Sequence, residues 1–342
     1  MNFNDFDKQE EIKMSPEEEK SHKKFFSRIG LSVFVYMLIF QLGASLVLAL
    51  LALVDKNIIN NETVVLIVSA AVQYLVAFPV LYFMLKPIPA SLPSDRRLST
   101  RELIKALSIA TLLIYAGQYI STLIISAIES ALGYTPENSV SQAFNGNTFA
   151  VTLIIAIIAP IIEEIVFRKL LVDRLRPYGE KLAIFFPALI FALAHGNLYQ
   201  LFYAFLIGVV LSYIYAKTGK ITYPIFIHMF VNLFFGVLTD YLSKAIDVNQ
   251  FLEYSYAGAL PVEYVEANML PLTLLTIYSI VFYALLCMGV FNLIRQLYSL
   301  RFEKGKYVFP KGKSLEITLF NAGTIAFVTL CIILIAISTF SV

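Results

Sequence analysis

The chain has 342 residues, of which 58% are hydrophobic and 15% are charged, and its mean hydropathy is +0.75. This composition excludes an ordinary soluble domain and indicates a membrane protein. The net charge of +2 says little about partners, and the sequence contains no P-loop and no GxGxxG segment, so we expect no nucleic-acid partner. Cys287 and Cys331 both fall in apolar segments, which predicts neither a disulfide framework nor a cysteine-based metal site.

The first 26 residues form a charged tail, which we interpret as cytoplasmic, disordered and solvated. The apolar run that follows is too long for a cleavable signal peptide, so it reads as a signal anchor. Most of the apolar segments are long enough to cross a hydrocarbon core of ~30 Å as helices. They cover residues 27–54, 62–86, 103–132, 147–172, 182–198, 199–217, 222–242, 270–297 and 317–341.

These segments predict an all-α, polytopic transmembrane helix bundle of about nine spans, with eight as the alternative because the fifth and sixth are short. With nine spans and a cytoplasmic N-terminus, only Lys56 and Lys244 of the 26 basic residues lie on the external side. That asymmetry follows the positive-inside rule and predicts an external C-terminus.

The chain therefore divides into the tail, three N-terminal spans in 27–132, a core in 147–242, an external loop in 243–269 and two C-terminal spans in 270–342. The external loop is acidic and contains tyrosines. We interpret it as an ordinary connection, with folding over the external face as the alternative.

Three ionisable residues interrupt the fourth apolar segment. Glu164 and Arg168 lie four residues apart and share a helix face, with the acid first, which favours an ion pair. Glu163 points about 100° away and lacks that partner. An unpaired carboxylate in apolar surroundings holds a proton more readily and suits a general base that acts on water. The alternative is a buried ion pair that locks two helices.

Two of the three histidines also fall in apolar segments. His195 ends the run FALAH, one turn after Phe191, which we expect to pack against its ring. His228 and Asn232 lie four residues apart and face one side of their helix. Such side chains can stabilise an oxyanion, although a lone histidine in a membrane is more often a hydrogen-bonding contact between helices.

Pro160 lies one turn before Glu163. It removes a backbone donor and either loosens the helix at this point or is simply tolerated.

The blocks EExxxR, FxxxH and HxxxN, in this order and each within an apolar segment, resemble the CPBP family of intramembrane proteases. That family includes the type II CAAX prenyl endopeptidases and the bacterial Abi proteins. The resemblance covers roughly residues 147–240, and Asn232 stands where some members carry Asp.

The resemblance implies hydrolysis of a peptide bond inside a membrane cavity. Glu163 would activate a water that His195 helps to hold, His228 and Asn232 would stabilise the oxyanion, and Glu164 with Arg168 would support the site. Two histidines and a carboxylate also form a known zinc set, so zinc remains open. We favour the glutamate mechanism because no HExxH pair is present.

Two other functions remain as alternatives: a non-catalytic scaffold or immunity protein that binds a membrane partner, and a proton-coupled transporter. We expect a peptide or membrane-protein substrate, contact with membrane lipid, and a bacterial plasma membrane, the last from the resemblance alone.

Overall fold

The computed structural model describes residues 14–91 and 95–340, and in that part of the chain every regular element is helical. Eight helical segments there are long and apolar enough to cross a membrane. The all-α, polytopic fold is therefore confirmed. The eight segments are Pro16–Val54, Glu62–Leu85, Thr100–Leu132, Thr148–Tyr178, Leu198–Thr218, Thr222–Ala245, Met269–Ser299 and Ala322–Phe340.

Several of these segments combine α-helix with short stretches of other helix. The elements in chain order are α1 (Pro16–Val54), η1 (Lys56–Asn60), α2 (Glu62–Ala71), η2 (Val72–Ala77), α3 (Phe78–Leu85), α4 (Thr100–Leu132), α5 (Ser139–Phe144), α6 (Thr148–Val151), η3 (Thr152–Ile158), α7 (Ala159–Glu164), η4 (Ile165–Val172), α8 (Asp173–Leu175), η5 (Arg176–Tyr178), α9 (Glu180–Ala194), α10 (Leu198–Thr218), α11 (Thr222–Val231), η6 (Asn232–Val237), α12 (Leu238–Ala245), α13 (Val248–Tyr256), α14 (Val262–Ala267), α15 (Met269–Ser299), α16 (Lys313–Leu319) and α17 (Ala322–Phe340).

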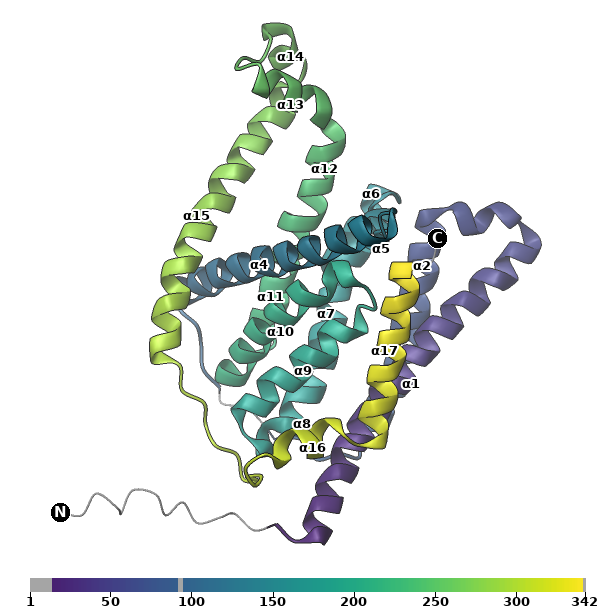
Figure 1. The fold of residues 1–342 in the computed structure, drawn as a ribbon, viewed down its shortest axis with the longest axis vertical. Coiled ribbons are helices and arrows are strands. Elements are labelled where there is room, and N and C mark those ends of the chain that lie inside the picture. The colour runs from purple at the N-terminus through teal and green to yellow at the C-terminus, as the bar shows by residue number, and fades with distance from the viewer. Residues whose placement is uncertain (1–13, 92–94, 341–342) are drawn as a thin grey trace, which may run out of the picture.

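The helices enclose a core around α9 and α10. Helix α4 runs obliquely across the bundle and packs on α10, which packs in turn on α9 (Figure 1). Helix α15 packs on the outer side of α4, and α1 and α17 lie side by side. Helix α1 begins at one end of the bundle and α17 finishes at the other (Figure 1).

The fifth predicted segment is a helix but is too short to span. Helix α9 has 15 residues, so it is about 22 Å long, against ~30 Å of hydrocarbon. It ends at His195 because Gly196 takes a left-handed conformation with φ of 65°. The last predicted segment, 317–341, is also divided, since α16 and α17 are separate helices.

The interpretation of the tail as disordered is wrong from Pro16 onward. Residues 1–13 lie outside the described part, but α1 starts at Pro16. Ser15 and Glu18 form a capping box, and acidic residues fill the first turn, both of which stabilise a helix start. Phe26 is fully buried, so this end of α1 belongs to the folded core.

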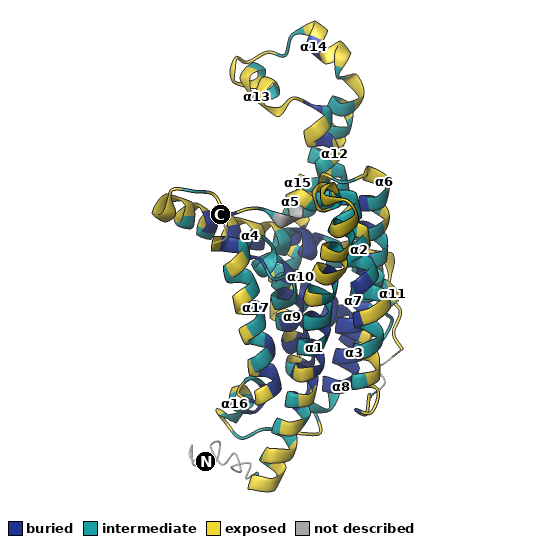
Figure 2. Cartoon of the chain, turned by 90° about the vertical axis from the view of Figure 1, so that its right-hand side faces the viewer, coloured by how far each residue is buried: buried dark blue, intermediate teal, exposed yellow. Residues whose placement is uncertain are grey.

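The region predicted as an external loop, 243–269, is largely helical. It contains α13 and α14 at the tip of an arm formed by α12 and α15 (Figure 1). The arm projects away from the bundle and is mostly exposed (Figure 2). Folding over the external face, the alternative interpretation of this loop, is therefore wrong.

Four stretches of π-helix, η2, η3, η4 and η6, interrupt the helices that surround the bundle interior. A π-turn widens the helix and leaves backbone groups that need other partners, and such turns are frequent at functional sites. In this chain they carry or adjoin polar side chains: Gln73 and Tyr74 in η2, Arg168 in η4 and Asn232 in η6.

Candidate active site

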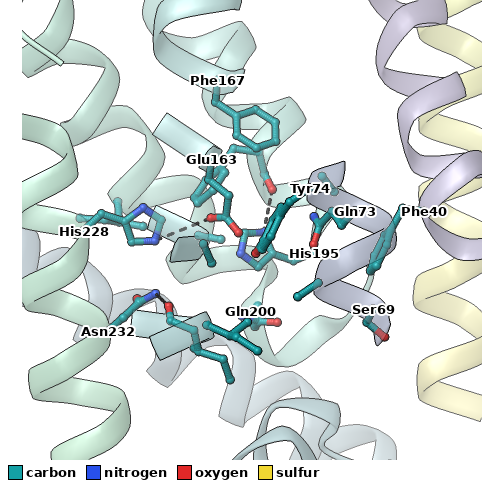
Figure 3. A pocket seen from close by; sticks show the side chains of 18 of the residues that line it. Phe40, Ser69, Gln73, Tyr74, Glu163, Phe167, His195, Gln200, His228 and Asn232 are labelled. Carbon is teal, nitrogen blue, oxygen red and sulfur yellow. Dashed lines mark hydrogen bonds and ion pairs between the residues drawn. The ribbon is translucent and has the colours of Figure 1, made fainter. Parts of the chain in front are cut away.

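The residues of the three sequence blocks converge on one cavity of about 300 Å³, here called the glutamate cavity. Glu163, His195, His228 and Asn232 line it, together with Phe191 (Figure 3). Its walls come from α1, α2, η2, η3, α7, η4, α9, α10, α11 and η6. Residues of the three sequence blocks, up to 69 positions apart in the sequence, thus meet inside the bundle.

The adjacent glutamates occupy different environments. Glu163 lines the glutamate cavity with 19% of its side chain exposed, whereas Glu164 is fully enclosed. This difference follows from the helix, which turns successive residues by about 100°. Glu163 is therefore the carboxylate that a molecule in the cavity can reach.

Glu164 is held on both of its oxygens. Its Oε2 lies 2.9 Å from Nε of Arg168, and its Oε1 lies 2.9 Å from Nδ1 of His228. Arg168 is fully buried, and its guanidinium lies over the ring of Phe191 at 4.9 Å. A buried charge is tolerated when it is paired in this way.

His228 thus connects the two glutamates, a contact that the sequence did not predict. Because Nδ1 faces Glu164, the other ring nitrogen faces Glu163, with 3.8 Å between Nε2 and Oε2. That separation is too long for a hydrogen bond. Fixing one ring nitrogen on a carboxylate orients the other toward the cavity.

His195 is oriented in a similar way by a different partner. Its Nδ1 lies 2.7 Å from the carbonyl oxygen of Phe191. A carbonyl oxygen only accepts, so Nδ1 carries the hydrogen and Nε2 of the neutral ring is left as an acceptor. The Phe191 ring contacts both histidines edge-on, with ring centres 4.7 Å from His195 and 5.8 Å from His228.

The turn between α9 and α10 explains how His195 reaches the same depth as Glu163. The predicted limits of 182–198 place His195 near the external end of its short segment, but α9 ends at Ala194, just before this residue. Non-helical backbone at membrane depth needs buried polar partners. Asn197 is one such partner, because its side chain accepts from the Gln200 N–H and donates to the His195 carbonyl. Ser121 of α4 is another, because it donates to the Leu198 carbonyl.

Asn232 is engaged with the backbone of the glutamate-bearing segment. Its Nδ2 donates to the carbonyl of Ile155 at 2.9 Å. In η3 the amide of Ala159 bonds five residues back to Ile154, so the next carbonyl, Ile155, would pair with residue 160. Residue 160 is proline and has no N–H, so Asn232 replaces the missing donor. The amide nitrogen keeps a second hydrogen.

The side chains that could serve as metal ligands at this site are Glu163, His195 and His228, all of which line the glutamate cavity. No group of three His, Cys, Asp or Glu side chains within the described residues is placed to hold a metal. Glu164 is committed to Arg168 and His228, so it is not free to bind a metal. The Nδ1 of each histidine is engaged, which leaves its Nε2 available to a molecule in the cavity.

Sequence reasoning missed the polar side chains on the opposite wall of the cavity. Gln73 and Tyr74 come from η2 and face Glu163 and His195 (Figure 3), and Gln73 donates to the Tyr36 hydroxyl. Gln200 and Tyr203 of α10 also line the cavity. The pair Gln73-Tyr74 in an otherwise apolar segment was the available signal.

Comparison with known proteins identifies the same region. Residues 145–234 match the family described as type II CAAX prenyl endopeptidase Rce1-like. The chain is 34% identical over 113 residues to the putative membrane peptidase YdiL of Bacillus subtilis, covering 31% of this chain and 45% of that protein. It is also 34% identical over 113 residues to the membrane-embedded CAAX protease MroQ of Staphylococcus aureus, covering 30% and 46%.

The matched region spans just under half of each relative, and no solved structure matches the chain significantly. The matched segment nevertheless contains all three sequence blocks and every helix that carries them. The chain is thus an integral membrane protein in which residues 145–234 are similar to the type II CAAX prenyl endopeptidase Rce1-like family.

Proposed function

We propose that this protein is an intramembrane endopeptidase in which Glu163 activates the attacking water. The observation that carries the proposal is that the adjacent glutamates Glu163 and Glu164 have different environments. Glu163 faces the glutamate cavity beside the imidazoles of His195 and His228, while Glu164 is used entirely in holding Arg168 and His228. A reachable carboxylate on a rigid support is what a general base requires.

The proposed reaction begins with water bound between Glu163 and Nε2 of His195, which accepts a hydrogen bond from it. Glu163 takes a proton as the water oxygen bonds to the carbonyl carbon of the substrate. Glu163 then returns that proton to the departing amide nitrogen, and the C–N bond breaks to give a carboxyl group and an amine. Base catalysis of this kind contributes ~10²–10⁴-fold.

The negative charge that develops on the substrate oxygen needs hydrogen-bond donors. Asn232 supplies its second Nδ2 hydrogen, since the first is bonded to Ile155. His228 donates through Nε2 when that nitrogen is protonated, with its ring already held by Glu164. One donor of this type is worth ~10²–10³-fold in rate.

The glutamate mechanism is favoured over a zinc mechanism by the donor set. Catalytic zinc needs three protein ligands, and no group of three His, Cys, Asp or Glu side chains among the described residues is placed to hold a metal ion. The substrate class that fits is a peptide segment of a membrane protein, because Glu163 is reached inside the bundle. A bacterial plasma membrane is the proposed location, from the bacterial relatives.

The test uses purified protein in detergent and a library of quenched fluorescent peptides. We expect the wild type to cleave at least one peptide, Glu163→Ala to lose that activity, and a strong chelator to have no effect. Cleavage that the chelator abolishes would replace the glutamate mechanism with a zinc mechanism. Absence of any Glu163-dependent cleavage would favour a non-catalytic scaffold.

A further inference from the structure

A second cavity, of about 580 Å³, lies between the ends of α4, α10 and α15 and the start of α9. It shares no lining residue with the glutamate cavity. Helix α10 separates the two: residues 200–207 face the glutamate cavity, and residues 209–218 face this one. We call it the lysine cavity, because Lys105 lines it.

The walls of the lysine cavity are apolar, and its volume is in the range of small-molecule sites, ~300–1,000 Å³. The aliphatic wall residues come from α4, α9, α10 and α15, and are Ile109, Leu113, Ile184, Val209, Val210, Ile214, Leu293 and Leu297. An occupant must therefore carry a substantial apolar part.

A line of polar contacts crosses the cavity. Lys105 of α4 donates to Oε1 of Gln296 on α15 at 2.6 Å, and Gln296 donates to the Tyr213 hydroxyl on α10 at 3.0 Å. The seam between α4 and α15 continues one turn further with Asn292 donating to Ser108. There Gly289 brings the two backbones together, since a Cβ would lie 2.3 Å from the Ser108 carbonyl oxygen.

Contacts between helices account for a polar residue at position 105 but not for a positive charge. A neutral side chain would serve to bond Gln296. Lysine near a span end usually extends to water, yet this amine turns inward. Among the described residues, no carboxylate lies within ion-pair distance of Lys105.

The charges around the mouth of the cavity are predominantly positive. Arg96, Lys105, Lys217 and Arg301 line it, with Glu102 as the acidic lining residue. Arg96 pairs with Glu102, and Lys217 pairs with Glu180. Arg301 donates to the carbonyl of Leu300, a neutral partner. Lys105 and Arg301 are thus two cations without a carboxylate partner among the described residues.

We propose that the lysine cavity binds an anionic phospholipid, with the phosphate at Lys105 and Arg301 and an acyl chain along the aliphatic walls. Basic pockets between spanning helices bind the headgroups of anionic lipids. A peptide substrate held here would not reach Glu163, because α9 and α10 intervene. The proposal is independent of the peptidase activity.

The test measures lipid binding to the purified full chain by native mass spectrometry, with phosphatidylglycerol and phosphatidylcholine as probes. We expect preferential binding of phosphatidylglycerol to the wild type. The double variant Lys105→Gln/Arg301→Gln should bind it about tenfold more weakly, and inorganic phosphate should not displace it, because the acyl chain supplies part of the affinity.

Arg101→Gln is the matched control, because Arg101 lies on the same helix, is exposed and does not line the cavity. It should leave phosphatidylglycerol binding unchanged. A second variant, Ala106→Phe, fills the apolar wall and should weaken both lipids. Equal binding of the two lipids by the wild type, or equal losses in Arg101→Gln and the double variant, would overturn the proposal.

Discussion

The glutamate cavity and the lysine cavity lie on either side of α10 and hold charge in contrasting ways. In the first, each charged group has a charged or ring partner: Glu164 contacts Arg168 and His228, and Glu163 faces His228. In the second, the amine of Lys105 bonds to the neutral amide of Gln296 and has no carboxylate partner among the described residues. Charged groups that pair with one another hold a catalytic side chain in place, whereas a cation without a carboxylate partner is free to bind an anionic ligand.

The largest effect on stability should come from breaking the closed network. Arg168→Met leaves the Glu164 carboxylate buried beside only His228, so we expect a loss of about 3–5 kcal/mol in the free energy of unfolding. Thermal unfolding of the purified protein in detergent measures this. The double variant Glu164→Gln/Arg168→Met should cost less than the two single changes together, because no lone charge remains.

Lys105→Gln is the matched control for that experiment, since it also removes one charge between helices. It should change the free energy of unfolding by less than about 0.5 kcal/mol, because a neutral amide can still donate to Gln296. If Lys105→Gln and Arg168→Met were equally destabilising, the contrast between the two cavities would be lost.

Removing the hydrogen bond from Asn232 to Ile155 should lower the free energy of unfolding by less than Arg168→Met does. Asn232→Ala should cost about 1–2 kcal/mol, because it leaves the Ile155 carbonyl without a donor. Pro160→Ala restores a backbone N–H at the position where one is missing, so the cost of Asn232→Ala should shrink in that background. A double-mutant cycle on thermal unfolding measures the coupling, and additive effects would contradict this account of η3.

The ion pairs outside the spans are exposed to water, so removing one of them should have the smallest effect on the free energy of unfolding. Lys23 and Lys313 donate to Glu316 at 2.7 and 2.8 Å and lower the pKa of Glu316 to about 2. A lowered pKa means that this contact stabilises the fold above the ordinary value of 4.5 and is lost as the pH falls through about 2.

The thermal midpoints of the wild type and Glu316→Gln should therefore differ slightly near pH 6 and converge below about pH 2. Exposed pairs of this kind contribute little, so the difference should be well below that of Arg168→Met. A gap that persisted or widened in acid would show that Glu316 acts in another way.

Much of this organisation could be predicted from the sequence, because membrane spans are long, apolar and interrupted at few positions. Six polar residues stood out in apolar segments: Glu163, Glu164, Arg168, His195, His228 and Asn232. All six lie either in the wall of the glutamate cavity or in the ion-pair network beside it. Residue type and spacing were sufficient for that, since a buried charge is costly wherever it lies.

The remainder depends on three-dimensional packing that spacing does not encode. That His228 bonds to Glu164 and faces Glu163 follows from the packing of α11 on α7, and the partner of Asn232 follows from the π-turn in η3. The short α9 was misjudged because apolar content alone does not reveal where a helix stops inside a bundle. Gly196 marked that end, yet its meaning depends on the buried contacts of Asn197.

The central claim is that Glu163 performs chemistry while Glu164 holds the site together. The most direct measurement compares Glu163→Gln and Glu164→Gln for peptide cleavage and for thermal midpoint in the same preparations. The account predicts that Glu163→Gln loses at least about 100-fold in cleavage rate with a near wild-type midpoint, and that Glu164→Gln lowers the midpoint. Wild-type cleavage by Glu163→Gln would contradict the claim.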